Sequence, residues 1–186
     1  MRSVIHGWSD LGLAARVIIV ALTGVTWAAR SLQGVLFNPD YWNPVTPAAF
    51  FSVYLYSAAF LLTGASMLIL RDVTREAPAL TTPILVVAAA CVVTGVANGI
   101  EDALGLRGFG LVYVVGIVVS GIGMFVIAAM FRATPARRLM FVPLLGGIAL
   151  AFMTQGGGVL GIVAWLGFGV VLIRERGGPN AAAIRA

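Results

Sequence analysis

The chain has 186 residues, of which 60% are hydrophobic and only 10% are charged, and its mean hydropathy is +1.02. A water-soluble domain of this length carries roughly a quarter of its residues as charged side chains, so the composition excludes an ordinary soluble protein. The formal net charge of +5 comes from arginine alone. In an apolar chain, such charge indicates membrane topology and contact with anionic lipid rather than nucleic-acid binding.

The kinds of residue in the chain give little support for an enzyme active site or a cofactor site. Cys91 is the only cysteine and lies in an apolar run, so no disulfide or CxxC pair can form within one chain. His6 is the only histidine, which leaves no bis-histidine haem site, no Ser-His-Asp set and few options for a metal. Glu101 and Asp102 are neighbours that point about 100° apart on a helix, a poor geometry for paired-carboxylate catalysis. We therefore expect no catalytic residue, no metal and no cofactor.

Long runs without charge recur along the chain, each about long enough, at roughly 20 residues, to cross a bilayer as a helix. The sequence predicts an all-α, polytopic bundle of six transmembrane helices. It forms a single domain over residues 1–176, followed by a short mobile tail at 177–186. The first four helices are predicted at about 11–29, 48–70, 82–100 and 109–131, and the last two form a hairpin over 139–173.

The predicted hairpin is short for two membrane crossings. Its 35 residues make about 52 Å of helix before a turn is subtracted, whereas two crossings need about 60 Å. The turn is expected at Thr154-Gln155-Gly156-Gly157-Gly158, where three glycines suit a tight turn and lack the Lys-Ser/Thr of a phosphate-binding loop. We expect the tip of the hairpin to lie below the bilayer surface.

Polar and small residues recur on single faces of the predicted helices. These are Gly24 and Ala28 on the first helix, Ser52, Tyr56, Thr63 and Ser66 on the second, and Tyr113, Gly116, Ser120 and Gly123 on the fourth. Close contact between neighbouring helices is the default explanation for such faces, and a solute path is the alternative.

The third predicted helix ends in a polar stretch. One stripe of it carries Cys91, Thr94, Asn98 and Glu101. Asn98 is expected about one turn inside the membrane boundary, where an unpaired amide costs several kcal/mol. We therefore predict that Asn98 is the centre of an internal polar cluster within reach of Tyr56 and Tyr113.

The connection between the first two helices contains two Asn-Pro turn signals and an aromatic pair, Tyr41 and Trp42. One interpretation is an interfacial loop whose rings join the aromatic belt of the membrane. The other is a lid over a cavity, in which Asp40, Asn38 and Asn43 offer polar contacts to a ligand.

The arginines orient the predicted bundle. With the N-terminus in the cytoplasm, the inner side collects all of the twelve arginines except Arg30 and Arg107. Under the positive-inside rule, this asymmetry predicts a multi-pass protein of the cell membrane with both termini in the cytoplasm. Asp40, Gln155 and the acidic pair of the third helix then lie on the outer side.

Six helices in 186 residues, with both termini inside, resemble the substrate-binding subunits of vitamin-uptake transporters of the energy-coupling-factor type. The resemblance covers size and topology and implies a membrane-embedded fold that binds a solute for uptake. It extends to no sequence motif, so no binding residue is carried over.

Two functions from different classes are open. The first is a solute-binding or transport protein with an outward-facing polar cavity, and the second is a non-catalytic membrane subunit or scaffold that packs on partner helices. The expected partners are membrane lipid, other membrane subunits or a second copy of the chain, and a small polar solute, but no nucleic acid. The residues predicted to bind the solute are Asn98, Glu101, Asp102, Tyr56, Tyr113, Asp40, Trp42 and Gln155, and Arg30 is expected to form an ion pair with Glu101 or Asp102.

Overall fold

The part of the chain that the structure describes is helical and contains no strand. The computed structural model describes residues 11–37, 46–106, 108–152 and 157–177. Its α-helices are α2 (Leu13–Phe37), α3 (Pro47–Val73), α4 (Thr81–Asn98), α5 (Gly110–Phe131), α6 (Phe141–Ala151) and α7 (Gly158–Gly177). The short elements η1 (Pro78–Leu80), η2 (Gly99–Ala103) and η3 (Arg137–Leu139) lie between them. The predicted all-helical fold with six helices is confirmed.

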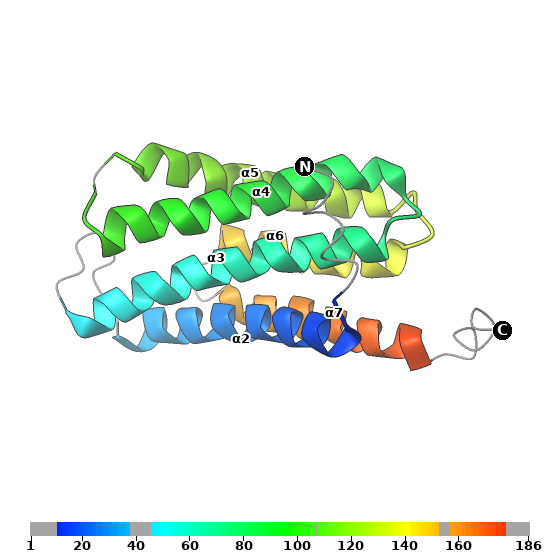
Figure 1. Cartoon of the computed structure of the whole chain (residues 1–186), viewed down its shortest axis with the longest axis horizontal. Helices are drawn as coiled ribbons and strands as arrows, with labels where there is room; N and C mark the ends of the chain where they lie inside the picture. The colour runs from blue at the N-terminus through cyan, green and yellow to red at the C-terminus, as the bar shows by residue number, and fades with distance from the viewer. Residues whose placement is uncertain (1–10, 38–45, 107, 153–156, 178–186) are drawn as a thin grey trace.

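The six helices form a closed ring, because each packs against the next helix in the chain and α7 packs against α2. Figure 1 shows them running alongside one another, with the start of α2 and the end of α7 at the same end of the bundle. Large side chains fill the middle of the ring: Phe60, Met67, Phe131, Trp165 and Phe168 are at most 1% exposed. The bundle is therefore closed in its centre.

The two ends of the bundle differ in charge. We call the end where α2 begins and α7 ends the arginine-rich end, because the described arginines that belong to it are Arg16, Arg71, Arg75, Arg132, Arg137, Arg138, Arg174 and Arg176. At the opposite end, η2 carries Glu101 and Asp102, and Arg30 lies on the last part of α2. We call this the acidic end.

In the described part of the chain, four helical segments are long and apolar enough to cross a membrane. The candidate spans are Leu13–Gly34, Pro47–Val73, Pro78–Asp102 and Gly110–Phe131. By contrast, α6 has 11 residues, about 16 Å of helix, against a hydrocarbon core of about 30 Å. The apolar part of α7, Gly158–Arg174, is also shorter than the four spans. The α6–α7 hairpin is thus short, as the residue count predicts, and its turn at 153–156 lies outside the described residues.

The first helix extends further than the sequence analysis placed it. The prediction ended this helix near residue 29, but α2 continues to Phe37. The run from Ser31 to Phe37 contains no proline, whereas the following Asn38-Pro39 disfavours helix at the residue before proline. Arg30 therefore lies inside the helix, not at its end.

Local sequence explains where α3 begins and ends. Pro47 occupies the first helical position, where its missing N–H costs no hydrogen bond, and Thr46 accepts a hydrogen bond from the Ala49 N–H at 3.2 Å. At the other end, the Thr74 hydroxyl donates to the Leu70 carbonyl at 2.9 Å. These caps fix the length of α3 and hence the positions of its buried polar side chains.

Polar side chains join α2 to α3 along the full length of the two helices. The residues of α2 that make these contacts follow one another at intervals of seven, four, three and three positions, so they share one face of the helix. From the arginine-rich end, the contacts are Arg16–Asp72, Thr23–Ser66, Trp27–Thr63, Arg30–Tyr56, and Gln33 with the Ala48 carbonyl. The hydroxyl face predicted for the second helix thus serves largely to hold α2 against α3.

Glycines allow other helices of the ring to approach closely. A methyl group on Gly24 would lie 3.4 Å from Ile162 of α7, so the small-residue face of the first helix has α7 as its neighbour. On α5, Gly116 and Gly123 face Thr94 and Val87 of α4. These contacts account for the glycine-rich side predicted for the fourth helix.

Candidate functional site

Tyr56 and Tyr113 meet at the acidic end of the bundle, on α3 and α5. Their ring centres are 5.9 Å apart, and Tyr56 is 5% exposed. The guanidinium carbon of Arg30 lies 5.4 Å from the centre of the Tyr56 ring, a distance at which a cation is attracted to an aromatic face. Arg30 and Asp102 are both close enough to act electrostatically on the two tyrosines. The structure therefore brings Tyr56, Tyr113 and Arg30 into contact, and Asp102 lies within electrostatic range of both tyrosines.

Further aromatic rings close this cluster on its inner side. Trp27 contacts Tyr56 edge-on, with ring centres 5.9 Å apart, and Phe60 lies 5.3 Å from Trp27 and 5.0 Å from Tyr56. Trp27 and Phe60 are 3% and 0% exposed. These rings separate the polar groups of the acidic end from the filled centre of the bundle.

Glu101 and Asp102 lie on η2, a single π-helical turn that extends α4. A methyl group built on Gly110 would lie 3.2 Å from Glu101 Oε1, so this carboxylate lies against the first residue of α5. The exposed N–H groups of a helix start favour a negative charge. The predicted pairing of Arg30 with Glu101 or Asp102 stays a prediction.

Asn98 is 5% exposed and points from α4 toward α3. Its Nδ2 donates to the Ser57 hydroxyl at 2.9 Å and to the Val53 carbonyl at 3.3 Å. The rest of its predicted stripe faces α5 instead: Cys91 contacts Ser120 at 3.4 Å, and Thr94 lies against Gly116. Because α4 sits between α3 and α5 in the ring, one polar stripe is divided between two neighbours.

Three buried polar atoms at the acidic end have no hydrogen-bond partner: Ser52 Oγ, Gln33 Oε1 and Glu101 Oε2. Ser52 is completely buried, and Gln33 is 7% exposed. Buried polar atoms in native proteins nearly always have a partner, so such atoms commonly indicate water, an ion or a ligand. Their concentration at this end indicates unused hydrogen-bonding capacity beside the predicted site.

The remaining predicted site residues, Asp40, Trp42 and Gln155, lie outside the described residues. The two interpretations of the connection that carries Asp40 and Trp42, an interfacial loop or a lid, therefore stay predictions, as does the role of Gln155 in the hairpin turn. Among the described residues, no group of three or more His, Cys, Asp or Glu side chains is arranged to hold a metal ion.

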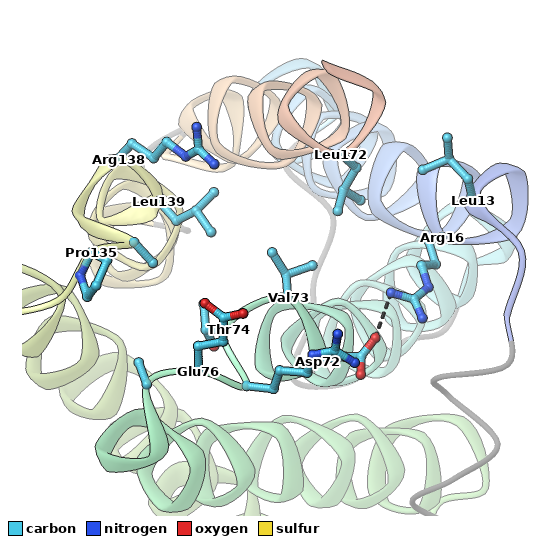
Figure 2. A pocket seen from close by; sticks show the side chains of 13 residues that line it. Leu13, Arg16, Asp72, Val73, Thr74, Glu76, Pro135, Arg138, Leu139 and Leu172 are labelled. Atoms are coloured by element: carbon cyan, nitrogen blue, oxygen red, sulfur yellow. Dashed lines mark ion pairs between the residues drawn. The ribbon is translucent and has the colours of Figure 1, made fainter. Parts of the chain in front are cut away.

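A hollow that the sequence did not predict lies at the arginine-rich end, and Figure 2 shows it from close by. It has a volume of about 540 Å³. Arg16 of α2 and Asp72 of α3 form an ion pair of 2.7 Å in its wall. Its other charged residues are Arg75, Glu76 and Arg138. The available signal was the presence of Asp72 and Glu76 among arginines on one side of the predicted bundle.

No known protein family, curated protein or solved structure matches the chain.

Proposed function

We propose that this protein is an integral membrane protein that binds, and in doing so helps to move, a small polar solute at the acidic end of its bundle. The observation that carries the proposal is the concentration of buried polar atoms without a partner, Ser52 Oγ, Gln33 Oε1 and Glu101 Oε2, at this end. A bound polar solute with its waters would satisfy these atoms, whereas a purely structural bundle gains nothing by leaving them unpaired.

The orientation that belongs to this proposal places the arginine-rich end in the cytoplasm. Of the described arginines, only Arg30 lies at the acidic end. The positive-inside rule then puts the site on the outer side of the cell membrane, with both termini inside. All six helices enter the bilayer, and the short α6–α7 hairpin enters from the cytoplasmic side without reaching the outer surface.

Two tyrosine substitutions test the site. Tyr56→Phe and Tyr113→Phe each keep the ring and remove the hydroxyl. Native mass spectrometry of the purified protein first identifies a solute that stays bound, and its binding is then measured for each variant. We expect either substitution to weaken binding by about tenfold, because a solute loses one buried hydrogen bond worth about 1–1.5 kcal/mol.

Tyr54→Phe is the matched control, because Tyr54 lies on the same helix as Tyr56 and is 56% exposed. Its substitution should leave binding unchanged. If Tyr56→Phe and Tyr113→Phe bind the solute as the wild type does, the site is not at the acidic end.

A membrane subunit that packs on partner helices is the second candidate, and the outer face of α5 favours it. Gly121 of α5 has nothing within 4 Å of an added methyl group, and the large residues beside it, Val118 and Ile122, are 50% and 61% exposed. Replacing Gly121 with Leu would block a close helix partner. A loss of assembly with unchanged solute binding would support this candidate over the first.

A further inference from the structure

We propose that a groove between α2 and α3 binds a membrane-soluble alcohol, a molecule with an apolar chain or ring that ends in a hydroxyl group. The groove has a volume of about 340 Å³, within the range of about 300–1,000 Å³ typical of small-molecule pockets. Its lining is Ala29, Leu32, Gln33 and Leu36 of α2 with Ala48, Phe51 and Leu55 of α3. Leu32, Leu36 and Phe51 are more than half exposed, so the groove opens on the outer surface of the ring.

The groove lies near one end of two candidate membrane spans. These spans are Leu13–Gly34 and Pro47–Val73, and the groove is built around the end of the first and the start of the second. In the proposed membrane arrangement, a molecule in the groove reaches from the level of the headgroups into the hydrocarbon region. A ligand with one polar end and an apolar body suits this depth and can enter from the bilayer itself.

Gln33 is the one polar residue among the described residues that line the groove. Its Nε2 donates to the Ala48 carbonyl at 2.8 Å. This bond fixes the orientation of the amide, because a reversed amide would place its oxygen against the carbonyl oxygen. Gln33 Oε1 is left as an acceptor that is buried without a hydrogen-bond partner, and Gln33 is only 7% exposed. An otherwise apolar groove thus contains one unsatisfied acceptor, which indicates a ligand that donates a hydrogen bond.

The side chains around Gln33 can admit such a ligand. Leu32, Leu36 and Phe51 are exposed, and exposed side chains change rotamer within nanoseconds without disturbing the core. The alcohol moves them aside, donates its hydroxyl to Gln33 Oε1 and covers their apolar surfaces with its chain. Burial of apolar surface contributes about 25 cal/mol per Å², so the chain supplies most of the affinity and the hydroxyl supplies selectivity.

The lining decides which polar group the ligand carries. Among the described residues, no charged side chain lines the groove. An ammonium, carboxylate or phosphate group would therefore lose its hydration without gaining a counter-ion. An ether or a ketone would bring a second acceptor to Gln33 Oε1 and no donor. A hydroxyl group is neutral and donates, so it meets both requirements.

Gln33 Oε1 is also one of the three atoms that support the proposed solute site. The groove assigns this atom to a second ligand, whereas Ser52 Oγ and Glu101 Oε2 remain for the solute. The inference rests on the membrane insertion that we propose but not on the solute, so each can be disproved without the other.

The test uses the full-length protein in phosphatidylcholine nanodiscs and a dodecanol that carries a photoreactive diazirine in its chain. After irradiation, mass spectrometry of peptides should locate the adducts mainly in residues 29–36 and 48–55. Dodecanol should compete for this labelling, whereas dodecyl methyl ether, which lacks the donor, should compete about tenfold more weakly. Labelling at an equal level on the exposed face of α5, or equal competition by the alcohol and the ether, would overturn the proposal.

Gln33→Leu removes the acceptor and keeps a side chain of similar size. In this variant, dodecanol should compete about tenfold more weakly than in the wild type. Thr26→Val is the matched control on the same helix, because Thr26 does not line the groove and its hydroxyl donates to the Leu22 carbonyl at 2.7 Å. The control should bind dodecanol as the wild type does. Equal weakening in the two variants would contradict a role for Gln33 in binding.

Two further variants complete the test. Ala29→Phe fills the groove and keeps Gln33, so it should remove the labelling of both stretches, and labelling at the wild-type level would disprove binding in the groove. Tyr56→Phe should weaken binding of the solute and leave the competition by dodecanol unchanged. If Gln33→Leu weakens binding of the solute but not of dodecanol, Gln33 belongs to the solute site and the inference is wrong.

Discussion

Trp27 Nε1 donates a hydrogen bond of 2.9 Å to Thr63 Oγ1 between α2 and α3, and both side chains are buried. Thr63 in turn donates to the Ala59 carbonyl at 2.7 Å. The hydroxyl thus accepts from one helix while it donates within its own. The indole N–H is buried away from water, so it depends on this single acceptor.

The first prediction follows from that dependence. Thr63→Val keeps the shape of the side chain and leaves the Trp27 N–H without a partner. We expect the free energy of unfolding to fall by about 1–2 kcal/mol, measured by denaturant unfolding in detergent micelles. Trp27→Phe completes a double-mutant cycle. A coupling energy near zero between the two substitutions would contradict the assignment.

The second prediction concerns the close approach of α4 and α5. A methyl group on Gly116 would collide with Thr94 Oγ1, so Gly116→Ala should destabilise the protein by about 1–3 kcal/mol. Gly121→Ala on the same helix meets nothing within 4 Å and should change the stability little. Thr94→Ala in the Gly116→Ala background should restore part of the loss. If Gly116→Ala and Gly121→Ala change the temperature of thermal unfolding equally, α4 and α5 do not make this close contact.

The third prediction separates structure from solute binding at Asn98. Asn98→Leu removes the hydrogen bonds to Ser57 and Val53 and should lower the stability by about 1–2 kcal/mol. Because both bonds end on α3, we expect solute binding to change less than in Tyr56→Phe. Lost solute binding with wild-type stability would instead make Asn98 a ligand contact, as the sequence analysis proposed.

The fourth prediction tests the ion pair in the wall of the hollow. Asp72→Asn keeps the shape and removes the charge opposite Arg16. We expect a loss of stability of about 1–3 kcal/mol, because the pair is largely shielded from solvent. Glu76→Gln is the control, since Glu76 is exposed and should tolerate the change. A loss at Glu76 as large as that at Asp72 would argue against a specific pair.

The fifth prediction concerns membrane orientation. In a Cys91→Ala background, Asp40→Cys should react with a membrane-impermeant maleimide on intact cells. Glu76→Cys should react only after the cells are permeabilised, because the proposed topology places the arginine-rich end in the cytoplasm. The reverse pattern of labelling would invert the proposed topology and move the solute site to the inner side.

The helices could be predicted from the sequence, because a helix that crosses a bilayer needs about 20 apolar residues. Charged residues separate such runs along this chain and so mark the connections. It placed the end of α2 too early because Arg30 was read as a boundary. In the structure, the Arg30 guanidinium lies over the Tyr56 ring. The charge that suggested the end of the helix is therefore accommodated inside the bundle.

The candidate site was predictable as a set of residues but not as a set of contacts. Periodicity shows which residues share a face, but it does not show which neighbours that face meets. Asn98 and Thr94 share a stripe, yet they contact α3 and α5 respectively. The hollow at the arginine-rich end was still harder to foresee, because its lining converges from four separate segments and depends on how the ring closes.

Closure of the ring by α7 on α2 has a consequence for how the protein is made. The two helices are separated by four others, so the face of α2 around Gly24 and Trp27 is synthesised long before its neighbour. Under the proposed membrane topology, lipid, an insertion factor or α7 of another copy covers that face until the chain's own α7 is inserted. In the last case, two chains would exchange their closing helices and form an interlocked dimer with the same internal contacts. In that topology, correct closure of the ring is favoured by a low density of chains, or by assistance that keeps α2 apart from foreign copies of α7.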